Sequence, residues 1–197
     1  MKYEKDLRLI ADILDCYRPE EGYDDWFVSF GSLLYIVRDM KHGEDLEQDI
    51  DISLFKRNAY EEIRKELLDS GFLFQHHIKH DITGETLNAH FKSPDGLPLD
   101  IFVWIEHDGQ FWHTYDYYLE KPEDGIPSSY HFKSCPINLL DGTHKIDFNI
   151  NGDYLRVPKN YGTLLDYWYP NWFVPDKNFG VSKAETIKTL KSCGELC

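Results

Sequence analysis

The chain has 197 residues and a formal net charge of −14, and 42% of its residues are hydrophobic and 15% aromatic. This length and composition predict a single folded domain over residues 1–197 and exclude a largely disordered chain. The acidic balance, with no basic run, excludes nucleic acid as an expected partner, because binding a phosphate backbone relies on lysine and arginine.

Helix and strand patterns alternate through the first half of the chain. Apolar residues at steps of three and four from Tyr3 to Leu14 predict a helix that ends near Arg18 and Pro19. The next predicted elements are a polar turn over 22–25, a strand over 26–29, a helix over 32–39, a charged loop over 40–48, a strand over 50–54, and a helix capped by Asn58 and closed by Gly71.

Three further strands, over residues 72–79, 86–93 and 98–106, are separated by turn signals and predict a meander. The combined pattern predicts an α+β fold with a mixed sheet flanked by helices. Residues 115–154 read as ordered irregular loops with short strands, followed by a helix over 160–167 and one over 183–191 capped by Ser182.

Targeting signals and cysteine pairs are not evident in the sequence. No segment approaches the roughly 20 apolar residues of a membrane span, and the N-terminus lacks the apolar core of a signal peptide. The four cysteines include no CxxC pair. We therefore expect a cytoplasmic protein with free thiols and no membrane span.

Asp49 and Asp51 flank Ile50 in the predicted strand 50–54. Side chains alternate between the two faces of a strand, so the two carboxylates share one face and the apolar side chains point to the other. Carboxylates held side by side repel each other unless a cation lies between them, and hard oxygen ligands suit Mg²⁺ or Mn²⁺. A solvent-exposed strand face is the simpler interpretation of the same pattern.

Two further features favour a functional site over that interpretation. Gly31 and Ser32 begin a predicted helix, whose unpaired backbone N–H groups and positive dipole end suit a phosphate. Asp100 is a lone acid in the apolar strand pattern LPLDIFVWI, where it lowers stability unless it has a function. The three aspartates and the helix start outline a two-metal phosphoryl-transfer site. Such a site is excluded if the carboxylate of Asp100 lies more than about 8 Å from those of both Asp49 and Asp51.

A second candidate cluster consists of histidines. His76, His77 and His80 lie in the segment HHIKHD, and His90 lies on the next predicted strand. Zinc is conceivable there, but residues four apart on a strand are about 13 Å apart, and zinc sites need three or four converging ligands. A solvated or aromatic-packed cluster is the favoured interpretation, and its role stays open.

Three segments together resemble a known family. GSLLYIVRD followed by DIDIS, PLDIFVW, and VPKNYGTLLDYWYPNWFVPD occur in this order in the sequence. They resemble the LicD/fukutin-related family of the DNA polymerase β-type nucleotidyltransferase superfamily. The resemblance implies a nucleotidyltransferase-like fold and a metal-dependent enzyme that transfers a phosphorylated alcohol, such as phosphocholine or ribitol phosphate, from a CDP-linked donor to a glycan hydroxyl.

The same resemblance implies roles for six residues. It assigns metal binding and catalysis to Asp49, Asp51 and Asp100. It assigns contact with the donor to three residues of the predicted helix, Gly31, Ser32 and Arg38. For Arg38, a solvated arginine at a helix end is an equally good interpretation. The implied cofactor is Mg²⁺ or Mn²⁺.

Two other functions fit the same residues. A general nucleotidyltransferase would use the aspartates to move a nucleotide from an NTP to a small molecule or protein. A catalytically silent module would bind a nucleotide or glycan without turnover. The sequence specifies neither the acceptor, nor the exact donor, nor the oligomeric state.

Overall fold

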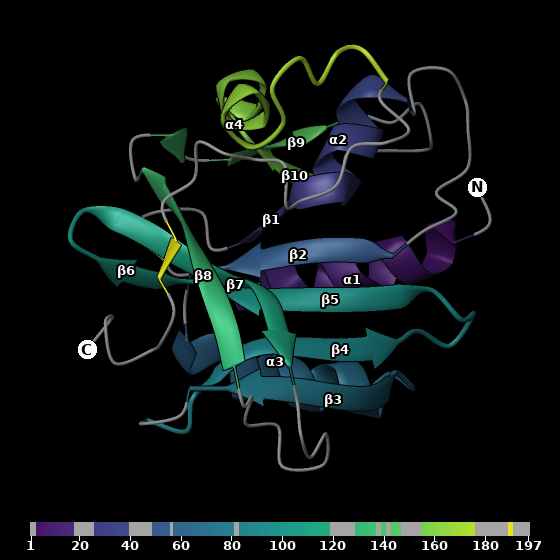
Figure 1. Cartoon of the computed structure of the whole chain (residues 1–197). Coiled ribbons are helices and arrows are strands. Elements are labelled where there is room, and N and C mark those ends of the chain that lie inside the picture. Colours follow the sequence, from purple (N-terminus) through teal and green to yellow (C-terminus); the bar gives the residue numbers. More distant parts are fainter. Residues whose placement is uncertain are drawn as a thin grey trace.

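A five-stranded mixed sheet lies at the centre of the molecule (Figure 1). The computed structural model describes residues 3–17, 26–39, 49–55, 57–80, 83–118, 129–136, 139–140, 143–146, 155–175 and 189–190. The sheet has the strand order β1-β2-β5-β4-β3. Its strands are β1 (Trp26–Val28), β2 (Ile50–Leu54), β3 (Leu73–Lys79), β4 (Thr86–Lys92) and β5 (Pro98–Val103).

The strand pairing makes this sheet mixed. Strands β3, β4 and β5 form the predicted antiparallel meander, and β1 is antiparallel to β2. Strand β2 pairs with β5 in parallel, after the chain has passed through α3 (Arg57–Asp69), β3 and β4. The α+β class and the mixed sheet flanked by helices are therefore confirmed.

Helices α1 (Glu4–Cys16) and α3 lie behind the sheet in the view of Figure 1. The apolar stripe predicted for α1 faces the core, because Tyr3, Leu7, Ile10 and Leu14 are all buried. Gly71 ends α3 with a φ of 90°, a backbone conformation that glycine adopts without strain. Helix α3 begins at Arg57, so Asn58 lies inside the helix and the prediction that it is the N-cap was wrong.

Helix α2 (Phe30–Arg38) follows β1 after a sharp turn. Phe30 has a φ of 47°, in the left-handed region that costs a residue with a side chain about 1 kcal/mol or more. Its ring packs against the rings of Trp168 and His113, with centroids 4.8 Å and 4.5 Å away. These contacts hold the turn that places the start of α2 beside β2.

A second sheet lies against the first and has the order β11-β8-β7-β6. Its strands are β6 (Ile105–His107), β7 (Gln110–Tyr118), β8 (Ser129–Pro136) and β11 (Thr189–Leu190). In Figure 1, β7 and β8 cross in front of the central sheet, and β7 contacts β4 and β5. A hairpin of β9 (Thr143–Ile146) and β10 (Leu155–Pro158) precedes α4 (Tyr161–Trp168), which lies against α2.

The second sheet corrects three predictions. The single strand predicted over 98–106 is divided at Trp104 into β5 and β6, which belong to different sheets. Residues 115–118 and 129–136 belong to long paired strands, where irregular loops with only short strands were predicted. In the helix predicted over 183–191, Thr189 and Leu190 instead pair with β8 as a strand. The rest of that segment, the turn at 22–25 and the loop at 40–48 lie outside the described residues.

None of the helices in the described part of the chain is both long and apolar enough to cross a bilayer.

Candidate metal centre

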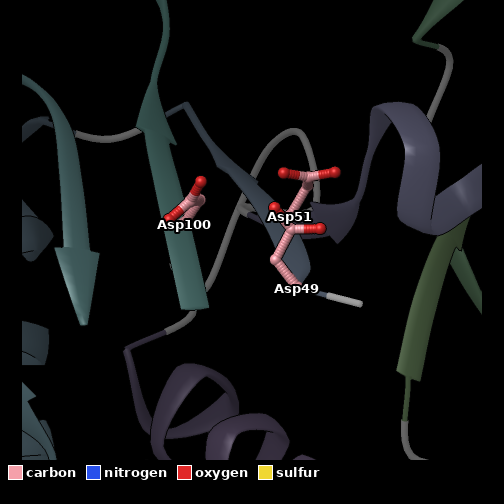
Figure 2. Close-up of side chains that lie close together, drawn as sticks. All are labelled: Asp49, Asp51 and Asp100. Carbon is pink, nitrogen blue, oxygen red and sulfur yellow. The ribbon is translucent and has the colours of Figure 1, made fainter. Parts of the chain in front are cut away.

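Three aspartates, on β5, on β2 and directly before β2, meet on one face of the central sheet (Figure 2). Asp51 on β2 is the direct partner of Asp100 on β5 in the parallel register, and Asp49 precedes Asp51 by two residues. One carboxylate oxygen from each lies within 4.8 Å of the other two. The distance limit of about 8 Å set for a two-metal site is therefore met.

The strands hold these side chains through the apolar residues on the opposite face. Ile50, Ile52, Leu99 and Ile101 are at most 1% exposed, while the three aspartates are only half-buried. Because successive side chains of a strand point to opposite faces of the sheet, burying these apolar side chains on one face places the carboxylates on the opposite face. Phe102, two residues after Asp100, is also on the aspartate face, and its ring contacts Phe30 with centroids 4.8 Å apart.

Ser32 connects the start of α2 to the aspartates. Its Oγ accepts a hydrogen bond from the backbone N–H of Asp51 at 2.8 Å. The same Oγ lies 3.1 Å from Oδ2 of Asp51 and 3.2 Å from the carbonyl oxygen of Asp49, and its one proton can be donated to either oxygen. The backbone N–H of Ser32 also donates to Oδ2 of Asp51 at 3.4 Å. The carboxylate of Asp51 therefore lies against the N-terminal end of α2, where a negative charge is favoured.

Electrostatics in the cluster oppose full ionisation. Burial, followed by the charges of Asp49 and Asp100, raises the pKa of Asp51 to about 8, although the hydrogen bonds from Ser32 act in the opposite direction. Burial and the charge of Asp100 also raise the pKa of Asp49. Burial and the nearby Asp51 raise the pKa of Tyr169, which places this buried tyrosine in the field of the cluster.

The donor atoms and their charge fit a hard divalent cation. Among the described residues, none of the three carboxylates forms an ion pair with a lysine or an arginine. Carboxylate oxygens are the ligands that Mg²⁺ and Mn²⁺ prefer, and a cation would offset the burial and the repulsion that together raise the pKa of Asp51. Asp49, Asp51 and Asp100 are thus the residues that could hold the metal.

Gly31 and Arg38, the other two residues expected to contact the donor, lie at opposite ends of α2. A methyl group added at Gly31 would lie 3.9 Å from Oδ2 of Asp51, so this glycine borders the cluster directly. Arg38 pairs with Asp39 at 2.7 Å and donates to the carbonyl oxygen of Trp172 at 3.1 Å. The structure thus brings Gly31 and Ser32 to the aspartates, whereas Arg38 forms its contacts at the far end of the helix.

His90 is the residue beside the cluster whose role the sequence left open. Its Nδ1 lies 2.6 Å from Oδ1 of Asp100, its partner in the antiparallel pairing of β4 with β5. The short connection from Ser93 to Leu97 is the signal that could have revealed this pair, because it nearly fixes the register of the two strands. Among the described residues, Asp49, Asp51 and Asp100 form the one group of three potential metal ligands, and His76, His77 and His80 form no such group.

Comparison of the chain with protein-family models and with curated proteins found no match. The resemblance to the LicD/fukutin-related family therefore stays a prediction.

Proposed function

We propose that the chain is a Mg²⁺- or Mn²⁺-dependent transferase of LicD type, which moves a phosphorylated alcohol such as phosphocholine or ribitol phosphate from a CDP-linked donor to a glycan hydroxyl. The observation that carries this proposal is the convergence of Asp49, Asp51 and Asp100 within 4.8 Å beside the start of α2. The choice of donor and acceptor follows from the family resemblance of the sequence.

The chemistry requires a neutral acceptor hydroxyl to attack a phosphorus atom that negatively charged oxygens surround. In the transfer, the acceptor hydroxyl oxygen forms a bond to the β-phosphorus of the donor, the bond from that phosphorus to the bridging oxygen breaks, and CMP leaves with the electron pair. A bound divalent cation would supply Lewis-acid stabilisation of the phosphate oxygens. Asp49 and Asp51 would hold the cation, and Asp100 would complete the site and accept the proton of the acceptor hydroxyl.

The residues around the aspartates support this assignment. Ser32 fixes the carboxylate of Asp51 from the side of α2. Gly31 leaves space beside the cluster, which suits a phosphate approaching the helix start. The free thiols of Cys16 and Cys135 agree with a cytoplasmic location, which we include in the proposal.

Product analysis separates this function from its two rivals. The protein is incubated with Mn²⁺ and, in turn, with CDP-choline, CDP-ribitol and each NTP, and the released products are identified. Release of CMP supports the proposed transfer, and release of pyrophosphate indicates a general nucleotidyltransferase. Binding of a nucleotide with neither product indicates a catalytically silent module.

Variants of the site test the role of the aspartates. Asp49→Asn and Asp100→Asn are expected to lose Mn²⁺ binding and turnover while keeping the fold, because each removes a charged ligand. The control is Asp69→Asn, which changes an exposed aspartate of α3 that pairs only with Lys65 in the described structure. Near-normal turnover in either site variant would overturn the proposal.

A further inference from the structure

A row of four polar side chains crosses the central sheet and ends at the metal cluster. His76 on β3 is the register partner of His90 on β4, His90 is the partner of Asp100 on β5, and Asp100 is the partner of Asp51 on β2. Residues in register on adjacent strands project to the same face of a sheet, so all four lie side by side on the aspartate face.

Contacts within the row are close. His90 Nδ1 and Asp100 Oδ1 are 2.6 Å apart, and the two side chains are 18% and 19% exposed. The rings of His76 and His90 stack with centroids 4.0 Å apart and an angle of 18° between their planes. An ionised carboxylate can only accept a hydrogen bond, so Nδ1 of His90 donates to Asp100.

This arrangement matches the one at Asp51. Ser32 hydrogen-bonds the carboxylate of Asp51 from α2, and His90 hydrogen-bonds that of Asp100 from β4, so two of the three aspartates are each held by a side chain outside the converging group. Groups that hydrogen-bond metal ligands fix the orientation of those ligands, and their loss typically costs 10–100-fold in metal affinity or activity.

We propose that His90 is a positioning residue of the metal centre: it fixes the carboxylate of Asp100 toward the cation, and His76 holds the ring of His90 by stacking. The inference rests on the proposed function, because it requires that the three aspartates bind a metal ion.

The test uses the position of the donor atom. In His90→Asn the side-chain N–H can occupy the place of Nδ1, in His90→Gln it lies one bond farther out, and His90→Phe keeps a ring for stacking but has no donor. We expect Mn²⁺ affinity, measured by calorimetry on the full chain, to fall about 10–100-fold in the Phe and Gln variants. The Asn variant should recover most of the affinity.

A matched control lies on the same strand as His76. His77 is the next residue of β3, points to the other face and contacts the ring of Phe74, so His77→Phe is expected to leave Mn²⁺ affinity unchanged. A purely structural role of His90 would make the Asn and Gln variants equal in affinity, which would overturn the inference. Thermal unfolding of each variant shows which of them fold. If His90→Phe does not fold, the comparison of the Asn variant with the Gln variant decides whether His90 has the positioning role.

The outcomes also separate this inference from the proposed function. If the unmodified chain binds no Mn²⁺, the proposed function fails. If it binds Mn²⁺ and His90→Phe binds equally well, the metal centre stands and the positioning role of His90 is wrong.

Discussion

Asp51 has the least favourable position of any single residue in the site when no cation is bound. In the unfolded chain its carboxyl group has an ordinary pKa of 3.8, while in the folded protein the pKa is raised to about 8. Between these values the folded state binds more protons than the unfolded state. The free energy of unfolding therefore falls as pH rises from about 4 to about 8, and the contribution of one such group is at most about 1.4 kcal/mol per pH unit.

We predict that Asp51→Asn removes this contribution. In the absence of divalent cations, the variant should be more stable than the unmodified chain near pH 8, and the difference should shrink as pH falls toward 4. Urea unfolding of both proteins at several pH values measures the difference, in which the other titrating groups largely cancel. A difference that does not change with pH would contradict the pKa assigned to Asp51.

At the scale of secondary structure, the start of α2 combines two unusual residues, the left-handed Phe30 and the glycine that follows it. Gly31 does not need a positive φ, and a methyl group added there would make only ordinary contacts. The fold therefore does not require glycine at this position. A requirement for glycine would have to come from a ligand approaching the helix start.

We predict that Gly31→Ala raises the free energy of unfolding by up to about 1 kcal/mol, because alanine favours the helix more than glycine does. Binding of the CDP-linked donor should weaken at least about tenfold, since 1.4 kcal/mol of steric cost gives that factor. The matched control is Gly162→Ala at the second residue of α4, where an added methyl group meets nothing within 4 Å. Equal donor affinity in both variants would show that no phosphate binds at Gly31.

The spacing of apolar residues correctly predicted the helices and strands that bury one face along their whole length. The stripe of α1 and the alternation of β2 were confirmed because their apolar side chains are buried as the pattern requires. Strands β7 and β8 were missed because their sequences mix aromatic, polar and charged residues, and their pairing with each other extends over most of their length. No local pattern encodes that pairing.

The residues of the site also differ in whether local sequence or long-range strand pairing brings them together. Asp49, Asp51, Gly31 and Ser32 could be grouped from spacing along the chain. Asp100 was predicted because an acid interrupts an apolar strand, but its parallel register with Asp51 depends on the order of strands in the sheet. The contact of His90 with Asp100 depends on register as well, and for that reason its role did not emerge from the sequence.

At the scale of the whole molecule, a partly buried ion pair joins three elements that are distant in the sequence. Asp15 of α1 accepts hydrogen bonds from Nε1 of Trp26 on β1 at 3.0 Å and from Nε of Arg156 on β10 at 2.8 Å. The side chain of Arg156 is only 8% exposed, and its guanidinium lies over the ring of Trp26. This contact attaches the β9–β10 hairpin to the central sheet.

We predict that Arg156→Ala lowers the free energy of unfolding by about 1–3 kcal/mol, because it removes a charged hydrogen bond and leaves Asp15 partly buried without that partner. Lys65→Ala, which breaks the exposed pair with Asp69, should cost less than about 1 kcal/mol. Urea unfolding followed by circular dichroism compares the two. Equal losses would mean that the hairpin is held mainly by other contacts.

The parallel pairing of β2 with β5 also sets the order in which the molecule can fold. Asp51 and Asp100 become neighbours only after the chain has folded back through α3, β3 and β4, so closing the site needs a long-range contact. We predict that this contact forms after the transition state for folding, so that the cation binds only beyond it. Adding Mn²⁺ should consequently slow unfolding in stopped-flow experiments and leave the refolding rate unchanged.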